Sequence, residues 1–384
     1  MNAAVIENKS AASTIDMLRI DGERLWKSLM ELAKIGATEK GGVCRLTLTD
    51  LDKQGRDLVL SWAREAGMSV VIDKIGNGFM RRAGRNNSLP PIVTGSHIDT
   101  QPTGGKFDGN YGVLAGLEVV RTLNDHGIET EAPIEVAFWT NEEGSRFVPV
   151  MMGSGVFAKA FTLEHAYAAR DTAGKSVKEE LERIGYVGTQ EPGDHPIGAY
   201  FETHIEQGPV LEDNDKTIGV VQGVLGIRWF DCTVTGMEAH AGPTPMALRK
   251  DALQVATHLM QEVVAAALRH KPHGRGTVGM VNVFPNSRNV IPGRVKFSID
   301  LATRPTHWST PWRPKSRPSP SGSARTAACR STSNWCRVTR RRSSTKTAWT
   351  RWRVPPPSSA TPTCRPSRAP GTTRSIWRSW RLPA

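Results

Sequence analysis

Short apolar runs and helically spaced apolar residues alternate along the first half of the chain. Leu25, Leu29 and Leu32 recur at the spacing of one helix face, whereas Ile134 to Trp139 is an almost continuous apolar run. Such an alternation predicts an α/β domain. We expect helices at 15–36, 50–66, 112–126 and 153–185, and strands at 91–93, 134–139 and 199–206, with a strand or hairpin at 68–80.

The pattern changes after Asp213. A strand-like run is followed by one helical stretch and then by two further strand-like runs, and this order predicts a smaller α+β domain. We place the first domain at 1–214 and the second at 215–301. The four elements of the second domain are expected at 217–235, 245–267, 276–283 and 289–301.

The composition changes again at Ala302. The net charge of the chain is +13, but residues 302–384 contain 16 Arg and 2 Lys without any Asp or Glu, so they contribute +18 and the other 301 residues contribute −5. Only four residues of this tail are Leu, Ile or Val, too few to offset the entropy of ordering it. We therefore expect a basic tail, rich in Pro, Ser, Thr and Arg, that is disordered.

The tail has two interpretations. Seven of the 11 Trp residues of the chain lie in it, whereas disordered segments usually lack aromatic residues. A mixture of Arg, Pro, Ser, Thr, Trp and Cys without acids is what GC-rich DNA encodes when it is translated out of frame. The alternative is a basic arm that binds nucleic acid.

The rest of the sequence shows no sign of export or of a membrane. The N-terminus lacks the basic-then-apolar pattern of a signal peptide, and no apolar run reaches the roughly 18 residues of a membrane helix. Cys44 and Cys232 match no metal or redox spacing, which fits a reducing compartment. We expect a cytoplasmic protein without a membrane partner and, if the tail is out of frame, without a nucleic-acid partner.

Polar side chains with metal-binding chemistry follow the predicted strands of the first domain. A His and an Asp follow the first run, an Asp lies in the glycine-rich loop before the next helix, a Glu pair follows the next run, and a second His follows the last. The carboxyl ends of strands are where α/β proteins build their sites. Together these residues suggest a hydrolytic metal centre. They are His97, Asp99, Asp108, Glu142, Glu143 and His204.

The spacing within these groups restricts what each residue can do. A carboxylate two residues after His97 can accept the second ring N–H and so fix the tautomer of the ring. Asp108 can bridge two cations with its two oxygens. Because adjacent residues of an extended chain point in opposite directions, one residue of the pair Glu142 and Glu143 can bind metal while the other reaches a bound water.

The chain contains, in order, the segments HIDTQPTGGKFDG, TNEEGSRF, HIEQGP, AHAGPTPMALRKDAL and SRNVIPG. Together these segments resemble the N-carbamoyl-amino-acid amidohydrolases, which include β-ureidopropionase and L-carbamoylase and have allantoate amidohydrolase as a close relative. That group belongs to the aminoacylase/carboxypeptidase superfamily of two-metal hydrolases. The resemblance covers about residues 18–301.

The resemblance implies a fold and an activity. The fold would be a two-metal aminopeptidase-like α/β catalytic domain with an inserted α+β domain that acts as lid and dimerisation domain, in a homodimer. The activity would be hydrolysis of the carbamoyl C–N bond of an N-carbamoyl amino acid, which gives the amino acid, carbon dioxide and ammonia. The two divalent metal ions could be zinc, manganese, cobalt or nickel, all of which suit His and carboxylate ligands.

The resemblance also implies a role for each residue of the centre. Glu142 would be the general base that takes a proton from water, and Asp99 would orient His97. The metal ligands would be His97, Asp108 and His204 for one ion, and Asp108 and Glu143 for the other.

Gln207, His240 and Asn289 resemble the substrate-binding residues of the family, and His240 would polarise the carbamoyl oxygen. The substrate would be N-carbamoyl-β-alanine or an N-carbamoyl-L-α-amino acid, and the segment QPTGGKFDG leans toward β-ureidopropionase. The alternatives are an allantoate amidohydrolase, a dipeptidase or aminoacylase of the same superfamily, and a non-catalytic protein with a nucleic-acid-binding tail.

The chain departs from the family's pattern near its C-terminus. Ala302 stands where the family has an Arg that clamps the substrate carboxylate, and the SHNE-like segment with the last His ligand is absent. The string APGTTRSIW at 369–377 is what the family's GAGHDAIYLA segment gives when GC-rich codons are read one base out of frame. We therefore expect the sequence from about Ala302 to be an out-of-frame translation.

Overall fold

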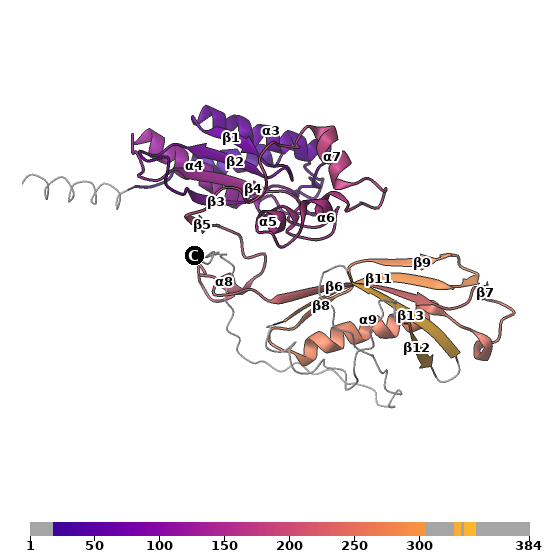
Figure 1. Cartoon of the computed structure of the whole chain (residues 1–384). Helices are drawn as coiled ribbons and strands as arrows, with labels where there is room; N and C mark the ends of the chain where they lie inside the picture. The colour runs from indigo at the N-terminus through magenta and orange to yellow at the C-terminus, as the bar shows by residue number, and fades with distance from the viewer. Residues whose placement is uncertain (1–17, 304–325, 332–333, 343–384) are drawn as a thin grey trace, which may run out of the picture. The chain divides into compact units, whose positions relative to one another are not determined.

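The structure is a computed structural model that describes residues 18–303, 326–331 and 334–342 (Figure 1). The described residues form two compact units, one that ends at Gln222 and one that begins at Gly223. We call them unit 1 and unit 2. The division predicted from the sequence lies at residues 214–215.

Unit 1 contains a five-stranded sheet in the order β1-β2-β4-β3-β5. β3 is parallel to both of its neighbours, β4 and β5, whereas β2 is antiparallel to β1 and to β4. The carboxyl ends of β3, β4 and β5 therefore meet at the same end of the sheet, which is where α/β proteins bind ligands. The strands are β1 (Ser69–Ile72), β2 (Gly78–Arg82), β3 (Ile92–His97), β4 (Ile134–Trp139) and β5 (Ala199–Phe201).

Three long helices pack on this sheet or on one another. α4 packs on β3 and β4, and its buried Val113, Leu117 and Val120 join the core of unit 1 at helical spacing. Thr49 caps α3, because its side chain accepts the backbone N–H of Asp52. The helix expected at 15–36 ends earlier, and its first residues lie outside the described part. The three helices are α2 (Gly22–Leu32), α3 (Asp50–Glu65) and α4 (Asn110–Asp125).

The stretch 153–185, which was expected to be helical, is divided into three short helices. Thr162 and Ser176 each cap a new helix N-terminus with a side-chain oxygen, and Gly174 between them has a φ of +82°. None of the described helices has both the length and the apolar character that crossing a membrane requires. The short helices are α5 (Met152–Phe157), α6 (Leu163–Tyr167) and α7 (Val177–Ile184), and α8 (Val210–Asp213) follows β5.

Unit 2 contains an antiparallel sheet with one long helix, α9, along one of its faces (Figure 1). β11 pairs with β6, β8 and β9, and the buried Phe297 of β11 shares a core with Val255 and Val263 of α9. β7 and β10 form a separate two-stranded ribbon. The elements are β6 (Gly226–Thr235), β7 (Ala239–His240), η1 (Met246–Leu248), α9 (Ala252–Arg269), β8 (Arg275–Thr277), β9 (Val281–Phe284), β10 (Val290–Ile291) and β11 (Arg294–Thr303).

The tail differs from the expected disorder in two segments. β12 (Thr326–Ser331) and β13 (Asn334–Arg342) form an antiparallel pair, and β13 also pairs with β6. The prediction rested on side-chain composition, but a strand at a sheet edge offers backbone N–H and C=O groups to any extended segment. Backbone pairing therefore explains strands in a sequence that is poor in aliphatic residues. The other residues after Thr303 lie outside the described part.

Candidate metal centre

Three residues whose side chains can bind a metal ion converge in unit 1 at the end of the sheet where β3 and β5 finish. His97 is the last residue of β3, Asp108 precedes α4, and His204 follows β5. The Nε2 atoms of His204 and His97 lie 3.3 Å and 3.8 Å from Oδ1 of Asp108. One ligand atom from each residue lies within 4.8 Å of the other two. Two imidazole nitrogens and a carboxylate at such distances can share one metal ion.

Both histidines present Nε2 to Asp108 because a backbone carbonyl holds the other ring nitrogen. Nδ1 of His97 lies 2.9 Å from the carbonyl oxygen of Asp99, and Nδ1 of His204 lies 2.8 Å from that of Ile205. A carbonyl oxygen can only accept, so Nδ1 carries the proton of the neutral ring. Nε2 then keeps the lone pair that a metal ion needs.

Asp99 orients His97 through a different atom from the one expected. The carboxylate was expected to accept the Nδ1–H group, but the backbone carbonyl accepts it, and a carboxylate oxygen of Asp99 lies 3.8 Å from Nδ1. The carboxylate instead accepts the backbone N–H groups of Glu142 and Glu143 at 3.3 Å and 3.4 Å. Asp99 thereby holds the turn after β4 that carries both glutamates.

The two glutamates have different surroundings. Oε2 of Glu142 lies 3.6 Å from Nε2 of His97. Oε2 of Glu143 accepts a hydrogen bond from the amide of Gln101 at 3.1 Å, whereas its Oε1 is buried and has no hydrogen-bond partner among the described residues. A buried carboxylate oxygen is costly unless a cation or water satisfies it. This environment fits the ligand role that was expected of Glu143.

Four carboxylates surround His97 and influence the pKa of its ring. Burial disfavours the charged ring, but Glu142, Asp99, Asp108 and Glu143 outweigh that effect and raise the pKa of His97 to about 9. Burial raises the pKa of Asp99 to about 6 and that of Glu143 to about 7. A ring with so high a pKa, next to a glutamate whose pKa is also raised, holds protons that a divalent cation would displace. The set of donors and the buried Oε1 of Glu143 therefore fit a divalent metal ion.

Two neighbours fix the position of Asp108. Gly109 has a φ of +68°, and a Cβ atom there would lie 2.5 Å from Nε2 of His97, so only glycine lets α4 begin this close to the ring. Gly109 is not among the predicted site residues, because the Asp-Gly pair is its only signal in the sequence. The amide of Gln207, which was expected to bind substrate, donates to Oδ2 of Asp108.

The other two predicted residues lie in unit 2, next to each other on the ribbon of β7 and β10. His240 pairs with Val290, and the backbone N–H of Ala241 donates to the carbonyl of Asn289 at 2.8 Å. Both predicted side chains are exposed. Nδ1 of His240 accepts the N–H of Gly242 at 3.0 Å, which leaves the proton of the neutral ring on Nε2. Their role in substrate binding stays a prediction.

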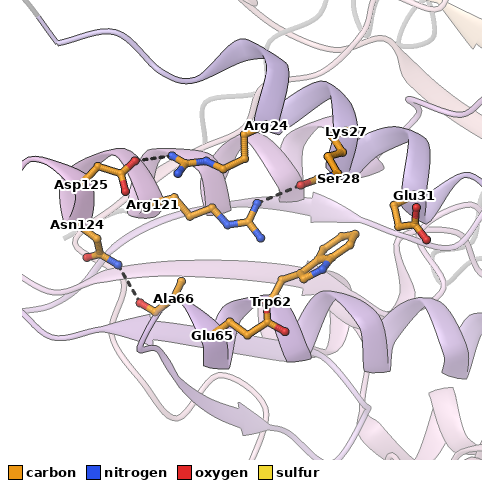
Figure 2. Close-up of a pocket in the computed structure, with 10 residues that line it drawn as sticks. All are labelled: Arg24, Lys27, Ser28, Glu31, Trp62, Glu65, Ala66, Arg121, Asn124 and Asp125. Atoms are coloured by element: carbon orange, nitrogen blue, oxygen red, sulfur yellow. Dashed lines mark hydrogen bonds and ion pairs between the residues drawn. The ribbon is translucent and has the colours of Figure 1, made fainter.

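A separate pocket of about 500 Å³ lies between α2, α3 and α4 (Figure 2). Two of its arginines have partners within the pocket: Arg24 lies 2.7 Å from Asp125, and Arg121 donates to Ser28 at 3.0 Å. Asp125 ends α4, whose 16 residues span about 24 Å. The pocket therefore lies at the other end of α4 from Asp108 and is no part of the metal centre.

Comparison with known proteins places these residues in a family. Residues 93–307, which include every predicted site residue, match peptidase family M20/M25/M40. The chain is 52% identical over 283 residues to an N-carbamoyl-L-amino-acid amidohydrolase of Rhizobium meliloti, covering 74% of this chain and 68% of that protein. It is 43% identical over 288 residues to an enzyme of the same description from Geobacillus stearothermophilus, covering 73% and 69%. A crystal structure of an amidase of the hydantoinase/carbamoylase family from Burkholderia vietnamiensis matches with a TM-score of 0.74 and 60% identity, covering 75% of this chain and 70% of that one.

Proposed function

Because the chain belongs to peptidase family M20/M25/M40, we propose that it is a metal-dependent amidohydrolase that cleaves the carbamoyl C–N bond of N-carbamoyl amino acids. The observation that carries this proposal is the convergence of His97, Asp108 and His204 at the carboxyl end of the sheet. One water is consumed, and the products are the amino acid, carbon dioxide and ammonia.

We assign the cations to the residues that the sequence singled out. His97, Asp108 and His204 would hold one divalent ion, and Asp108 and Glu143 would hold the second. A cation at this place supplies Lewis-acid chemistry, because it polarises a carbonyl group and lowers the pKa of water. Zinc, manganese, cobalt and nickel all accept this mixture of imidazole and carboxylate ligands.

The remaining residues move protons and bind the substrate. Glu142, whose carboxylate lies beside the ring of His97, accepts a proton from the attacking water and delivers it to the departing nitrogen. His240 donates its Nε2 proton to the carbamoyl oxygen as negative charge develops there. Gln207 and Asn289 bind polar groups of the substrate through their amides.

The descriptions of the two relatives favour an N-carbamoyl-L-α-amino acid as substrate over N-carbamoyl-β-alanine, toward which the segment QPTGGKFDG leans. Ammonia release from both compounds and from allantoate, together with the release of free amino acids from a dipeptide, would rank these substrates directly. Faster turnover of allantoate or of the dipeptide would move the proposal to one of the other activities of the superfamily.

Removal of the metal is expected to abolish hydrolysis. The chain is treated with a chelator, freed of it, and assayed with an N-carbamoyl-L-amino acid before and after addition of Zn²⁺, Mn²⁺, Co²⁺ or Ni²⁺. The same assay is run on the protein made from a gene that keeps the family's reading frame after codon 301. Hydrolysis that is equally fast in excess chelator would contradict the proposal for both proteins.

We also propose that unit 2 pairs two subunits into a homodimer. Val264 and Leu268 of α9 are 49% and 56% exposed and lie four residues apart, so they form an apolar stripe on one helix face. The double change Val264→Glu and Leu268→Glu should convert a dimer into a monomer, because two buried like charges oppose association. Light scattering after size-exclusion chromatography measures this, and a dimeric mass for the double variant would refute the assignment of α9.

A further inference from the structure

Arg45 is a fully buried arginine whose hydrogen-bond partners among the described residues are all uncharged. Its Nε donates to the carbonyl of Ile98 at 2.9 Å, and its Nη2 donates to Oδ1 of Asn110 at 2.8 Å. Its Nη1 donates to two carbonyls at the end of α2, those of Ile35 at 2.9 Å and Leu32 at 3.3 Å. Buried charges are usually paired with an opposite charge. The acceptors around Arg45 therefore match the donor positions of its guanidinium. The charged groups near it lie beyond hydrogen-bond distance.

The partners of Arg45 lie in the two segments that supply the first two metal ligands. Ile98 lies between His97 and Asp99, and Asn110 follows Asp108 by two residues. The backbone of Arg45 adds two more bonds to the first segment, because its N–H donates to Oγ1 of Thr100 at 2.7 Å and its carbonyl accepts the N–H of Thr100 at 2.9 Å. One residue thus binds both ligand segments and the end of α2.

Asn110 connects Arg45, through hydrogen bonds, to the loop that carries Asp108. The side-chain amide of Asn110 accepts from Arg45 through Oδ1 and donates through Nδ2 to the carbonyl of Lys106 at 3.1 Å. The backbone N–H of Asn110 also donates to the carbonyl of Asp108 at 2.7 Å. Rotation or loss of the guanidinium would therefore release the turn from Lys106 to Asn110.

Gly55 gives independent support, because it makes room for this side chain. Gly55 lies inside α3, where glycine is less favourable than alanine. A Cβ atom at residue 55 would lie 2.8 Å from Cδ and 3.0 Å from Nε of Arg45. α3 therefore has a helix-weakening glycine at the position where the side chain of Arg45 passes close to the helix.

We propose that Arg45 is a positioning residue that holds the His97 and Asp108 segments at the separation that a shared cation requires. This inference rests on the proposed function, because the cation is that of the hydrolytic centre. Arg45 touches no reacting atom. It acts only through the hydrogen bonds that it makes to Ile98, Thr100 and Asn110.

The test compares Arg45→Met with Arg82→Met in the full chain. Arg82 is a matched control, because its guanidinium also donates to an asparagine of α4, Asn124 at 2.8 Å, and to a backbone carbonyl, that of Ile128 at 2.6 Å. It does so at the far end of α4 from Asp108. Each metal-free variant is titrated with Co²⁺, its thermal unfolding is recorded, and hydrogen–deuterium exchange is measured by peptide.

Arg45→Met should weaken Co²⁺ binding by about 10–100-fold, as removal of groups that orient metal ligands generally does, and should speed amide exchange at 97–112. Arg82→Met should leave both nearly unchanged and affect exchange only near 122–130. Arg45→Lys, which keeps the charge but reaches fewer acceptors, should lie between wild type and Arg45→Met. Equal losses of Co²⁺ affinity in the two Met variants, or faster exchange throughout unit 1 in Arg45→Met, would overturn the proposal.

Two further measurements test the inference if Arg45→Met does not fold or if the wild-type chain binds no Co²⁺. If Arg45→Met does not fold, Gly55→Ala replaces it, because this variant keeps the arginine and displaces its stem; unchanged Co²⁺ affinity and unchanged exchange at 97–112 would then refute the role. If the wild-type chain binds no Co²⁺, the cation of the proposed function is in doubt. Exchange alone then decides on Arg45: local acceleration supports positioning, and its absence excludes it.

Discussion

Replacement of Glu142 by glutamine is expected to lower kcat by about 10²-fold or more while the metal content stays that of the wild type. The amide cannot accept a proton from water, but it keeps the size of the side chain and the backbone hydrogen bond to Asp99. The measurement is kcat with an N-carbamoyl-L-amino acid, together with metal analysis after dialysis, on protein made in the family's reading frame.

Glu143→Gln should behave in the opposite way. The buried Oε1 of Glu143, which has no hydrogen-bond partner in the described part of the chain, is the atom that we assign to a cation, so the variant should lose metal and regain activity when metal is added in excess. Glu164→Gln, a change at an exposed residue of α6, serves as the control and should alter neither quantity. Retained metal in Glu143→Gln with lost metal in Glu142→Gln would show that the two roles are exchanged.

Restoration of the reading frame after codon 301 is expected to raise kcat/KM by at least about 10²-fold over the 384-residue chain. The family's frame supplies an Arg that clamps the substrate carboxylate and a final His ligand, and even a group that only orients a metal ligand is commonly worth 10–100-fold. The string APGTTRSIW at 369–377 motivates this expectation. Sequencing of the gene through codon 302 and a comparison of the two proteins measure it.

A confirmed reading frame with a fully active 384-residue chain would contradict this expectation. The basic tail would then need its own function, and binding of nucleic acid that weakens steeply with salt would support the alternative of a basic arm. The antiparallel pair of β12 and β13 does not decide between the two, since backbone pairing at the edge of β6 does not depend on which side chains the segment carries.

The strands that carry the centre could be predicted because of where they lie in the sheet. β4 was expected at 134–139 and has these bounds, since a strand with neighbours on both sides and a buried surface gives a continuous apolar run. β5 was expected to extend to 206 but ends at Phe201. Beyond it, the buried carboxylate of Glu202 accepts the hydroxyls of Ser96 and Tyr200, and such a polar network has no periodicity that a sequence could reveal.

The candidate metal ligands could be predicted from the sequence, whereas the residues that support them could not. His and acidic residues at the ends of apolar runs or in the glycine-rich loop that follows stand out by residue type, which is why His97, Asp108 and His204 were named and are found together. Arg45 looks like a surface residue in the sequence, because a charged side chain is rarely buried and only the fold shows that it is. The carbonyl of Asp99 was missed for a related reason: every residue has one, so its use depends on backbone geometry alone.

The shortness of β5 has a consequence for the lifetime of the protein. Within the described part of the chain β5 pairs only with β3, through the three residue pairs Ile92–Ala199, Val93–Tyr200 and Thr94–Phe201. A cation shared by His97 and His204 would join the ends of these two strands. A ligand that binds only the folded state adds about 2.7 kcal/mol when its free concentration is 100 times its Kd. The ion would thus act as a cross-link for an edge strand. In a cell short of metal, this segment would unfold more often and be cleaved by proteases, and hydrolysis of the substrate would also be lost.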